Sequence, residues 1–190
     1  SVSAFLLNRS SDLWAYADFT ARVNNYMAQD KDFESPYEGE AEVCHYLELL
    51  RDKIGFDKVR EAVKNPLTGR KIAAYYGCLL LRPGKVMALD DPENPRIMED
   101  FIRALGAEPV IYPFRNECCG GYVALEDEES AAKKSRSVTE SAEKGGADTI
   151  VTACPLCKYN LVKNESPVPV VYFTELLAEA LGVKEEDDAE

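Results

Sequence analysis

Four short apolar runs, separated by segments of helical character, constrain the fold of this chain more than any other feature. The runs are rich in β-branched and aromatic residues, which favours strands. They are KIAAYYGC (71–78), EPVIYPF (108–114), ADTIVTAC (147–154) and VPVVYF (168–173). Strands that alternate with helices along a chain pair in parallel. We therefore expect an α/β fold, with a four-stranded parallel, Rossmann-like sheet and crossover helices.

Helix signals mark the segments between these runs. A helix is expected over residues 94–106, with Asn94 as the N-cap, Pro95 in the first turn and Gly106 after the last turn. A polar helix is expected over residues 126–146, and a closing helix follows the last strand. These helices supply the connections that a parallel sheet requires.

The residues before the first strand are expected to form a helical region. Helical spacing of apolar residues extends over residues 13–27 and again over residues 43–54, and a short third helix is expected over residues 57–64. The end of the chain, KEEDDAE, is acidic and is expected to be disordered. The predicted organisation is a helical N-terminal region (1–65), an α/β domain (66–183) and an acidic tail (184–190).

The charge of the chain excludes several classes of partner. Its net charge is −12, and its densest basic stretch, Lys133–Arg136, lies in a predicted helix and is expected to be solvated. We therefore expect no nucleic-acid partner and no anionic membrane surface as a partner. No apolar run approaches the roughly 18 residues of a membrane span, and the stretch SVSAFLLNRSSD does not show the basic leader and long apolar run typical of a signal peptide. The six cysteines are then expected to be metal-binding or redox thiols in the reducing cytoplasm.

Five of the six cysteines follow the ends of predicted strands. Cys78 closes the first strand, Cys118 and Cys119 follow the second, and Cys154 and Cys157 follow the third. The carboxyl ends of parallel strands share one edge of the sheet, which is where open α/β sheets bind ligands. We therefore expect five thiols from three separate segments to converge on one crevice.

The stretch NECCGGY raises the question of how two adjacent cysteines can serve one site. On a strand they would point to opposite faces, but a loop after a strand can turn both the same way. Gly120 and Gly121 are expected to supply positive φ angles and close approach of the backbone to a bulky ligand. Five thiolates suit a multi-iron cluster better than zinc, which takes four ligands. Zinc binding and thiol redox chemistry without metal stay open as alternatives.

At these residues the chain resembles a known family. The order of Cys78, Cys118–Cys119–Gly120 and Cys154–Pro155–Leu156–Cys157 is similar to the CCG cysteine-rich domain in the B subunit of heterodisulfide reductase. Several segments resemble the second such domain of that protein: YYGCLLLRP, DDPENP, ALGAEPV and ADTIVTACPLCKYNL. The resemblance extends from about Val43 to the end of the chain. The resemblance implies a non-cubane [4Fe–4S] cluster held by all five cysteines, with catalysis passing through that cluster.

The resemblance also implies a function and partners. The family reductase cleaves a disulfide substrate with electrons supplied by ferredoxin-like iron–sulfur and flavin subunits, in anaerobic metabolism such as methanogenesis. The family subunit carries two CCG domains, and only one is visible here, so residues 1–42 are expected to be the remnant or fragment of a first one. The alternative is a non-catalytic electron-relay or docking subunit of a succinate-, glycolate- or lactate-type oxidoreductase. A zinc-binding structural domain is a further alternative.

Other residues receive weaker assignments. Arg82, four residues after Cys78, is a candidate for holding an anionic substrate. His45, the only histidine, is a candidate for substrate binding or a proton relay, with an ordinary capped or exposed histidine as the alternative. Cys44 is expected to be a core residue of the helix around it, and the pair Tyr75–Tyr76 is expected to lie in the core.

Overall fold

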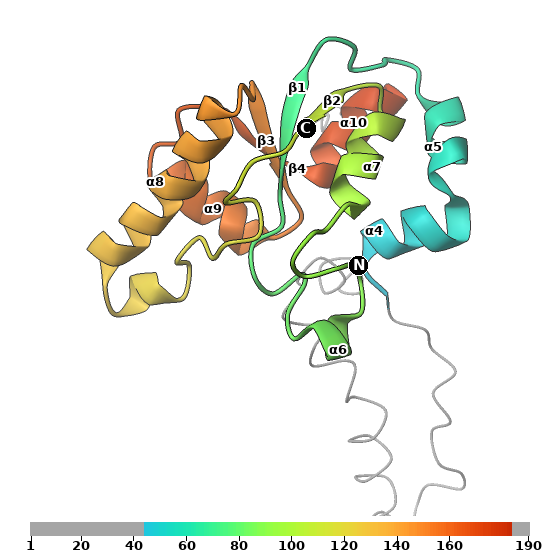
Figure 1. Cartoon of the computed structure of the whole chain (residues 1–190). Coiled ribbons are helices and arrows are strands. Elements are labelled where there is room, and N and C mark those ends of the chain that lie inside the picture. Colours follow the sequence, from blue (N-terminus) through green and yellow to red (C-terminus); the bar gives the residue numbers. More distant parts are fainter. Residues whose placement is uncertain (1–43, 184–190) are drawn as a thin grey trace, which may run out of the picture.

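The structure is a computed structural model that describes residues 44–183. It contains one sheet of four parallel strands in the order β2-β1-β3-β4, as drawn in Figure 1. The strands are β1 (Lys71–Tyr75), β2 (Glu108–Val110), β3 (Thr149–Thr152) and β4 (Val170–Tyr172). The predicted α/β class and parallel sheet are confirmed, and all four strands lie within the predicted runs.

Helices cover both faces of the sheet (Figure 1). They are α7 (Ile97–Ala104) and α10 (Phe173–Leu181) on one face, and α8 (Glu128–Lys144) and α9 (Pro155–Lys163) on the other. Side chains of the central strand β1 alternate between the two faces, as the pleat of a strand requires. Ile72 and Ala74 are buried in the core beneath α7 and α10, whereas Ala73 and Tyr75 belong to the core beneath α8 and α9.

The register of the strands aligns their carboxyl ends. Tyr75 pairs with Thr152, and Thr152 pairs with Tyr172, so β1, β3 and β4 end at one level. Strand β2 ends two positions earlier, where Val110 pairs with Ala73. The chain then runs as a loop alongside β1, since the N–H of Tyr76 donates to the carbonyl of Arg115 at 2.8 Å. All of the cysteine-bearing segments therefore leave the sheet at the same edge.

The helical region before the sheet is confirmed where the structure describes it. It comprises α4 (Tyr46–Glu48), the π-helical turn η1 (Leu49–Ile54) and α5 (Phe56–Ala62). Leu47 and Leu50 are buried in the same core as α7 and α10, because they fill the space beside these helices. The predicted helix over residues 13–27 and the acidic tail lie outside the described residues. The domain boundaries stay a prediction.

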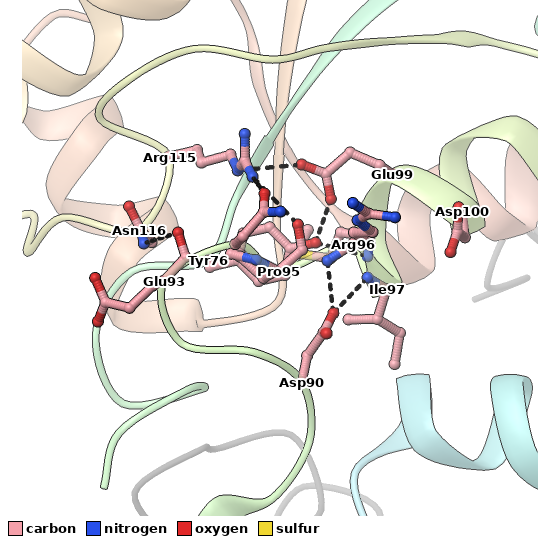
Figure 2. A network of polar contacts seen from close by, with 12 residues as sticks. Tyr76, Asp90, Glu93, Pro95, Arg96, Ile97, Glu99, Asp100, Arg115 and Asn116 are labelled. Atoms are coloured by element: carbon pink, nitrogen blue, oxygen red, sulfur yellow. Dashed lines mark hydrogen bonds and ion pairs between the residues drawn. The ribbon is translucent and has the colours of Figure 1, made fainter. Parts of the chain in front are cut away.

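The start of α7 differs from the prediction. The helix begins at Ile97, and Asn94 does not cap it. Instead, the carboxylate of Asp90 accepts hydrogen bonds from the N–H groups of Arg96 and Ile97, at 2.6 and 2.7 Å (Figure 2). A loop residue thus satisfies the first donors of the helix, which leaves Asn94 to bind a different partner. Short helices α6 (Gly84–Met87) and η2 (Val123–Leu125) were not predicted.

Candidate metal centre

A pocket of ≈ 360 Å³ lies at the carboxyl edge of the sheet. All five cysteines that follow the strands contribute to its wall: Cys78, Cys118, Cys119, Cys154 and Cys157. The remaining lining is largely apolar, with Leu79, Leu80 and Leu156 among its members. The structure therefore brings together the residues that strand topology placed at one edge. We call this site the cysteine pocket.

The thiols form close pairs within this pocket. The Sγ atoms of Cys78 and Cys118 are 3.9 Å apart, and those of Cys119 and Cys157 are 3.7 Å apart. None of the six cysteines, all of which the structure describes, is in a disulfide. Within residues 44–183, no group of three or more His, Cys, Asp or Glu side chains is arranged to hold a single metal ion. The thiols are thus spread around a cavity rather than gathered on one point.

Glycines at the strand ends make room for the sulfurs. Gly77 has a φ of 64°, and a Cβ atom added there would lie 2.9 Å from the Sγ of Cys157. Gly120 has a φ of 82°, as predicted, but its space is taken by the backbone of Ala131 on α8, at 2.8 Å from an added Cβ. Gly121 does not adopt a positive φ, so the prediction was wrong for that residue. The vicinal cysteines are therefore turned by Gly120 and packed against α8.

The third cysteine segment is the start of a helix. Cys154 is the N-cap residue of α9, Pro155 occupies its first turn, and Cys157 follows one turn later. The N–H of Cys154 donates to Thr152 Oγ1 at 3.4 Å. The N-terminus of a helix carries partial positive charge, which stabilises negative charge placed beside it.

Two buried polar side chains hold Cys119 from the side of α8 and α9. Asn160 Nδ2 donates to the Cys119 carbonyl oxygen at 2.6 Å, and Ser135 Oγ donates to the same oxygen at 3.2 Å. Both side chains are almost fully buried. Sequence reasoning missed both residues. The sequence offers one weak sign that Asn160 belongs to the site. It lies three residues after Cys157, which places both side chains on the same side of the helix.

A charged network holds the residues before Cys118 from the side of α7 (Figure 2). Arg115 Nε lies 3.4 Å from Glu99 Oε1, and its Nη2 donates to Asn94 Oδ1 at 2.7 Å. The hydroxyl of Tyr76 donates to Glu99 Oε2 and accepts from the N–H of Met98 at 3.0 Å. This network ties the loop after β2 to α7 and to β1.

The hydrogen bonds between thiols divide them into donors and acceptors. The pKa of Cys118 is lowered to about 6, chiefly because its sulfur accepts a hydrogen bond from Cys78. The Gly120 N–H and the charge of Lys134 lower this pKa further, whereas burial raises it. The pKa of Cys119 is lowered because it accepts from Cys157. Donation to these partners and burial raise the pKa of Cys78 and Cys157. The thiolate of Cys118 is therefore favoured at neutral pH, and the pKa of Cys119 is shifted in the same direction.

Of the weaker candidates, Tyr76 lines the cysteine pocket, whereas Arg82 and His45 do not. Arg82 donates to the carbonyls of Asn116 and Pro92 and pairs with Glu93 at 2.9 Å, so it joins two loops beside the pocket. Its role in substrate binding stays a prediction. Tyr75 and Tyr76 are buried in the core as expected, and the Tyr75 hydroxyl donates to the Glu117 carbonyl at 2.8 Å.

His45 is buried rather than placed in the cysteine pocket. It is the N-cap of α4, and its Nδ1 accepts from the Leu47 N–H at 3.1 Å. Burial lowers the pKa of its imidazole to about 4, with the Ala153 carbonyl opposing this effect, so the ring is neutral at neutral pH. Its ring centroid lies 5.8 Å from that of Phe173. Cys44 is half-buried and precedes α4, so it does not lie in the helix as expected. Neither residue lines the cysteine pocket.

Comparison with known sequences identifies the class of this domain. Residues 72–162 match the CCG cysteine-rich domain, and this segment of the chain belongs to that family. The match contains all five cysteines of the pocket. The resemblance inferred from the sequence is thereby confirmed.

The relatives of the whole chain carry different names. The chain is 31% identical to the B subunit of the ferredoxin:CoB-CoM heterodisulfide reductase of Methanosarcina mazei, over 80% of this chain and 54% of the relative. It is 32% identical to the 8-methylmenaquinol:fumarate reductase membrane anchor subunit of Wolinella succinogenes, over 85% of this chain and 59% of the relative. A protein of Archaeoglobus profundus, named as similar to the heterodisulfide reductase B subunit, is 32% identical, over 77% and 54%. The chain thus spans little more than half the length of these relatives.

One of these relatives is named as a membrane anchor subunit. Among the residues that the structure describes, no helix combines the length and the apolar character needed to cross a bilayer.

Proposed function

We propose that this chain is an iron–sulfur subunit of a heterodisulfide reductase-like oxidoreductase complex. Its cysteine pocket holds a [4Fe–4S] cluster of the non-cubane type, and Cys78, Cys118, Cys119, Cys154 and Cys157 are the ligands. One observation carries this proposal: five thiols from three segments of the sequence line a single pocket of ≈ 360 Å³. The relatives named as heterodisulfide reductase subunits support the same class of function.

The spacing of the thiols supports a group with several metal atoms. Two thiolates on one tetrahedral metal lie about 3.8 Å apart when the metal–sulfur bonds are about 2.3 Å. The Cys78–Cys118 and Cys119–Cys157 pairs, at 3.9 and 3.7 Å, both have this spacing. Two such pairs fit two metal positions within one pocket. A single zinc ion would use four thiols and leave the fifth without a role.

The residues around the thiols prepare the pocket for this cluster. Leu79, Leu80 and Leu156 give it an apolar wall, and Gly77 leaves space next to Cys157. Asn160 and Ser135 fix the backbone of Cys119, while the Arg115–Glu99 pair fixes the loop before Cys118. When bound, the cluster would supply one-electron transfer. We place its electron donors in other subunits, of the ferredoxin-like iron–sulfur and flavin types, and its substrate among disulfides.

Anaerobic reconstitution of the full chain tests the cluster. About four iron atoms and about four sulfides per chain, with an electron paramagnetic resonance signal after oxidation or reduction, are expected. Serine variants of each of the five pocket cysteines should lose iron, and Cys44→Ser is the matched control that should retain it. Stoichiometric zinc without sulfide would reject the proposal.

A second candidate is a relay or docking subunit that does not itself cleave a disulfide. It is favoured by the relative named as a subunit of a fumarate reductase, and by the chain's span of little more than half of its relatives. A disulfide-cleavage assay with reduced viologen as the electron donor separates the two candidates. Turnover by the reconstituted chain supports the reductase, whereas reduction of the cluster without turnover supports the relay.

A further inference from the structure

A second hollow, of ≈ 350 Å³, lies on the other side of Cys118. Its wall includes Cys118 and Glu117 from the loop after β2, and Lys133, Lys134 and Ser137 from α8. Phe114 and Val138 add apolar surface. Cys118 is the one cysteine that lines both this hollow and the cysteine pocket. We call this hollow the lysine groove.

The charge of the lysine groove differs from that of the chain. Most of the surface is acidic, since the net charge is −12, yet the groove holds two ammonium groups and a single carboxylate, that of Glu117. Lysines elsewhere on α8 and α9 are paired with glutamates, at 3.3, 2.5 and 2.6 Å: Lys144–Glu140, Lys158–Glu175 and Lys163–Glu128. Within residues 44–183, Lys133 and Lys134 form no ion pair. Their charges remain available to an anion.

These charges lie beside the thiol, because Lys133, Lys134 and Cys118 line the same hollow. Cys118 itself is half-buried, so it can be approached from outside. A molecule in the groove would therefore meet a positive charge and a sulfur atom at the same time.

We propose that the lysine groove binds a small organic anion, carrying a carboxylate, phosphate or sulfonate, next to Cys118. Lys133 and Lys134 bind the anionic group, and the apolar wall receives the carbon chain. The identification of this anion as a thiol or disulfide compound rests on the proposed function. The anion selectivity of the groove does not, because it depends only on residues of α8 and of the loop after β2.

The first test compares two alkylating reagents of the same shape on the full-length, metal-free, reduced chain. Iodoacetate is anionic and iodoacetamide is neutral, and both need the same thiolate, so the ratio of their rates reports local charge alone. Mass spectrometry gives this ratio for each cysteine. We expect the ratio at Cys118 to exceed that at Cys154, which does not line the groove, by about threefold to tenfold at low salt.

Variants assign this selectivity to the lysines. In the double variant Lys133→Gln, Lys134→Gln, the ratio at Cys118 should fall to that at Cys154. The exposed Lys58 lies on α5, so Lys58→Gln is the matched control and should leave the ratio unchanged. Equal ratios at the two cysteines of the wild-type chain would overturn the proposal, as would a double variant that keeps the wild-type ratio.

Protection by unreactive ligands tests binding directly. Thiodiglycolate is a thioether with two carboxylates, and thiodiglycol has hydroxyl groups in their place. Thiodiglycolate should slow the alkylation of Cys118 by iodoacetamide in the wild-type chain but not in the double lysine variant, and thiodiglycol should have no effect in either. Equal protection by the two compounds, or none, overturns the proposal. Iron content is measured separately, so failure here leaves the cluster proposal standing.

Discussion

The two faces of the sheet bury different kinds of polar side chain. On the face covered by α7 and α10, the buried polar groups include three ionisable side chains, those of Glu99, Arg115 and His45. On the face covered by α8 and α9, Ser135 and Asn160 are neutral. Both sets support segments that carry the pocket cysteines or lie beside them.

This difference has a physical consequence. The neutral side chains contact Cys119 itself and keep the same hydrogen bonds at any pH. The ionisable ones contact other residues: Glu99 binds Tyr76, and His45 lies against Phe173. The ionisable residues on the α7 face should therefore make the stability of the chain depend on pH and on charge pairing. The shape of the pocket wall at Cys119 should depend on the α8–α9 face.

The largest expected effect comes from breaking the charged pair on the α7 face. Glu99→Ala leaves the Arg115 guanidinium, whose side chain is only 11% exposed, without its carboxylate. Loss of one partner of a buried pair costs about 3–5 kcal/mol in the free energy of unfolding. Urea unfolding measures this loss.

The control for this variant is the neighbouring residue. Asp100 pairs with Arg103 on the surface, where both side chains are about half exposed, and Asp100→Ala should cost less than about 1 kcal/mol. If the two variants prove equally stable, the charged network does not hold the loop before Cys118.

The next effect is the pH dependence that His45 gives to the same face. The pKa of its imidazole is about 4 in the folded chain and 6.5 ordinarily. Between these values the unfolded chain binds more protons, so the contribution of His45 is fully present above pH 6.5 and is lost as the pH falls through 4. The loss amounts to about 3 kcal/mol.

His45→Asn is the informative variant, because it keeps a side-chain acceptor at the N-cap and removes the titrating group. Free energies of unfolding of both chains are measured between pH 7 and pH 4. The wild-type curve should fall more steeply than that of the variant, and parallel curves would show that His45 titrates normally.

The fold and the meeting of the cysteines could be predicted because both follow from local patterns and one topological rule. Apolar runs with helical segments between them specify a parallel sheet, and parallel strands bring their carboxyl ends to one edge. Cys78, Cys118 and Cys154 each follow such an end. Neither result depends on how the side chains pack.

The supporting residues could not be predicted in this way. Asp90 caps a helix that begins seven residues later, and the loop between them sets that contact. Asn160 and Ser135 are 25 residues apart, and both appear as ordinary polar residues on helices until the helices are packed together. Their role depends on which face of each helix is buried, and the polar sequence of α8 gives little sign of it.

A smaller effect is expected from the neutral face. Asn160→Leu removes the shorter of the two hydrogen bonds to the Cys119 carbonyl. The cost should be about 1–3 kcal/mol, as for a buried acceptor that loses a donor. The amount of iron bound after reconstitution should also decrease in Asn160→Leu. When the two variants are compared at the same fraction of folded protein, Glu99→Ala should lose less iron. Unchanged iron content in Asn160→Leu would mean that this side chain supports the fold alone.

The smallest effect is expected for Ser135→Ala. The Cys119 carbonyl keeps its bond from Asn160, so the loss should be about 1 kcal/mol. Ser137→Ala, on the same helix but bonded only to a carbonyl within it, is the control and should cost less than about 0.5 kcal/mol. Because Ser135 and Asn160 also bond each other at 3.1 Å, their effects should not add. A double variant whose cost equals the sum of the single costs would show that the two side chains act on Cys119 independently, and the neutral face would then be two separate contacts rather than one network.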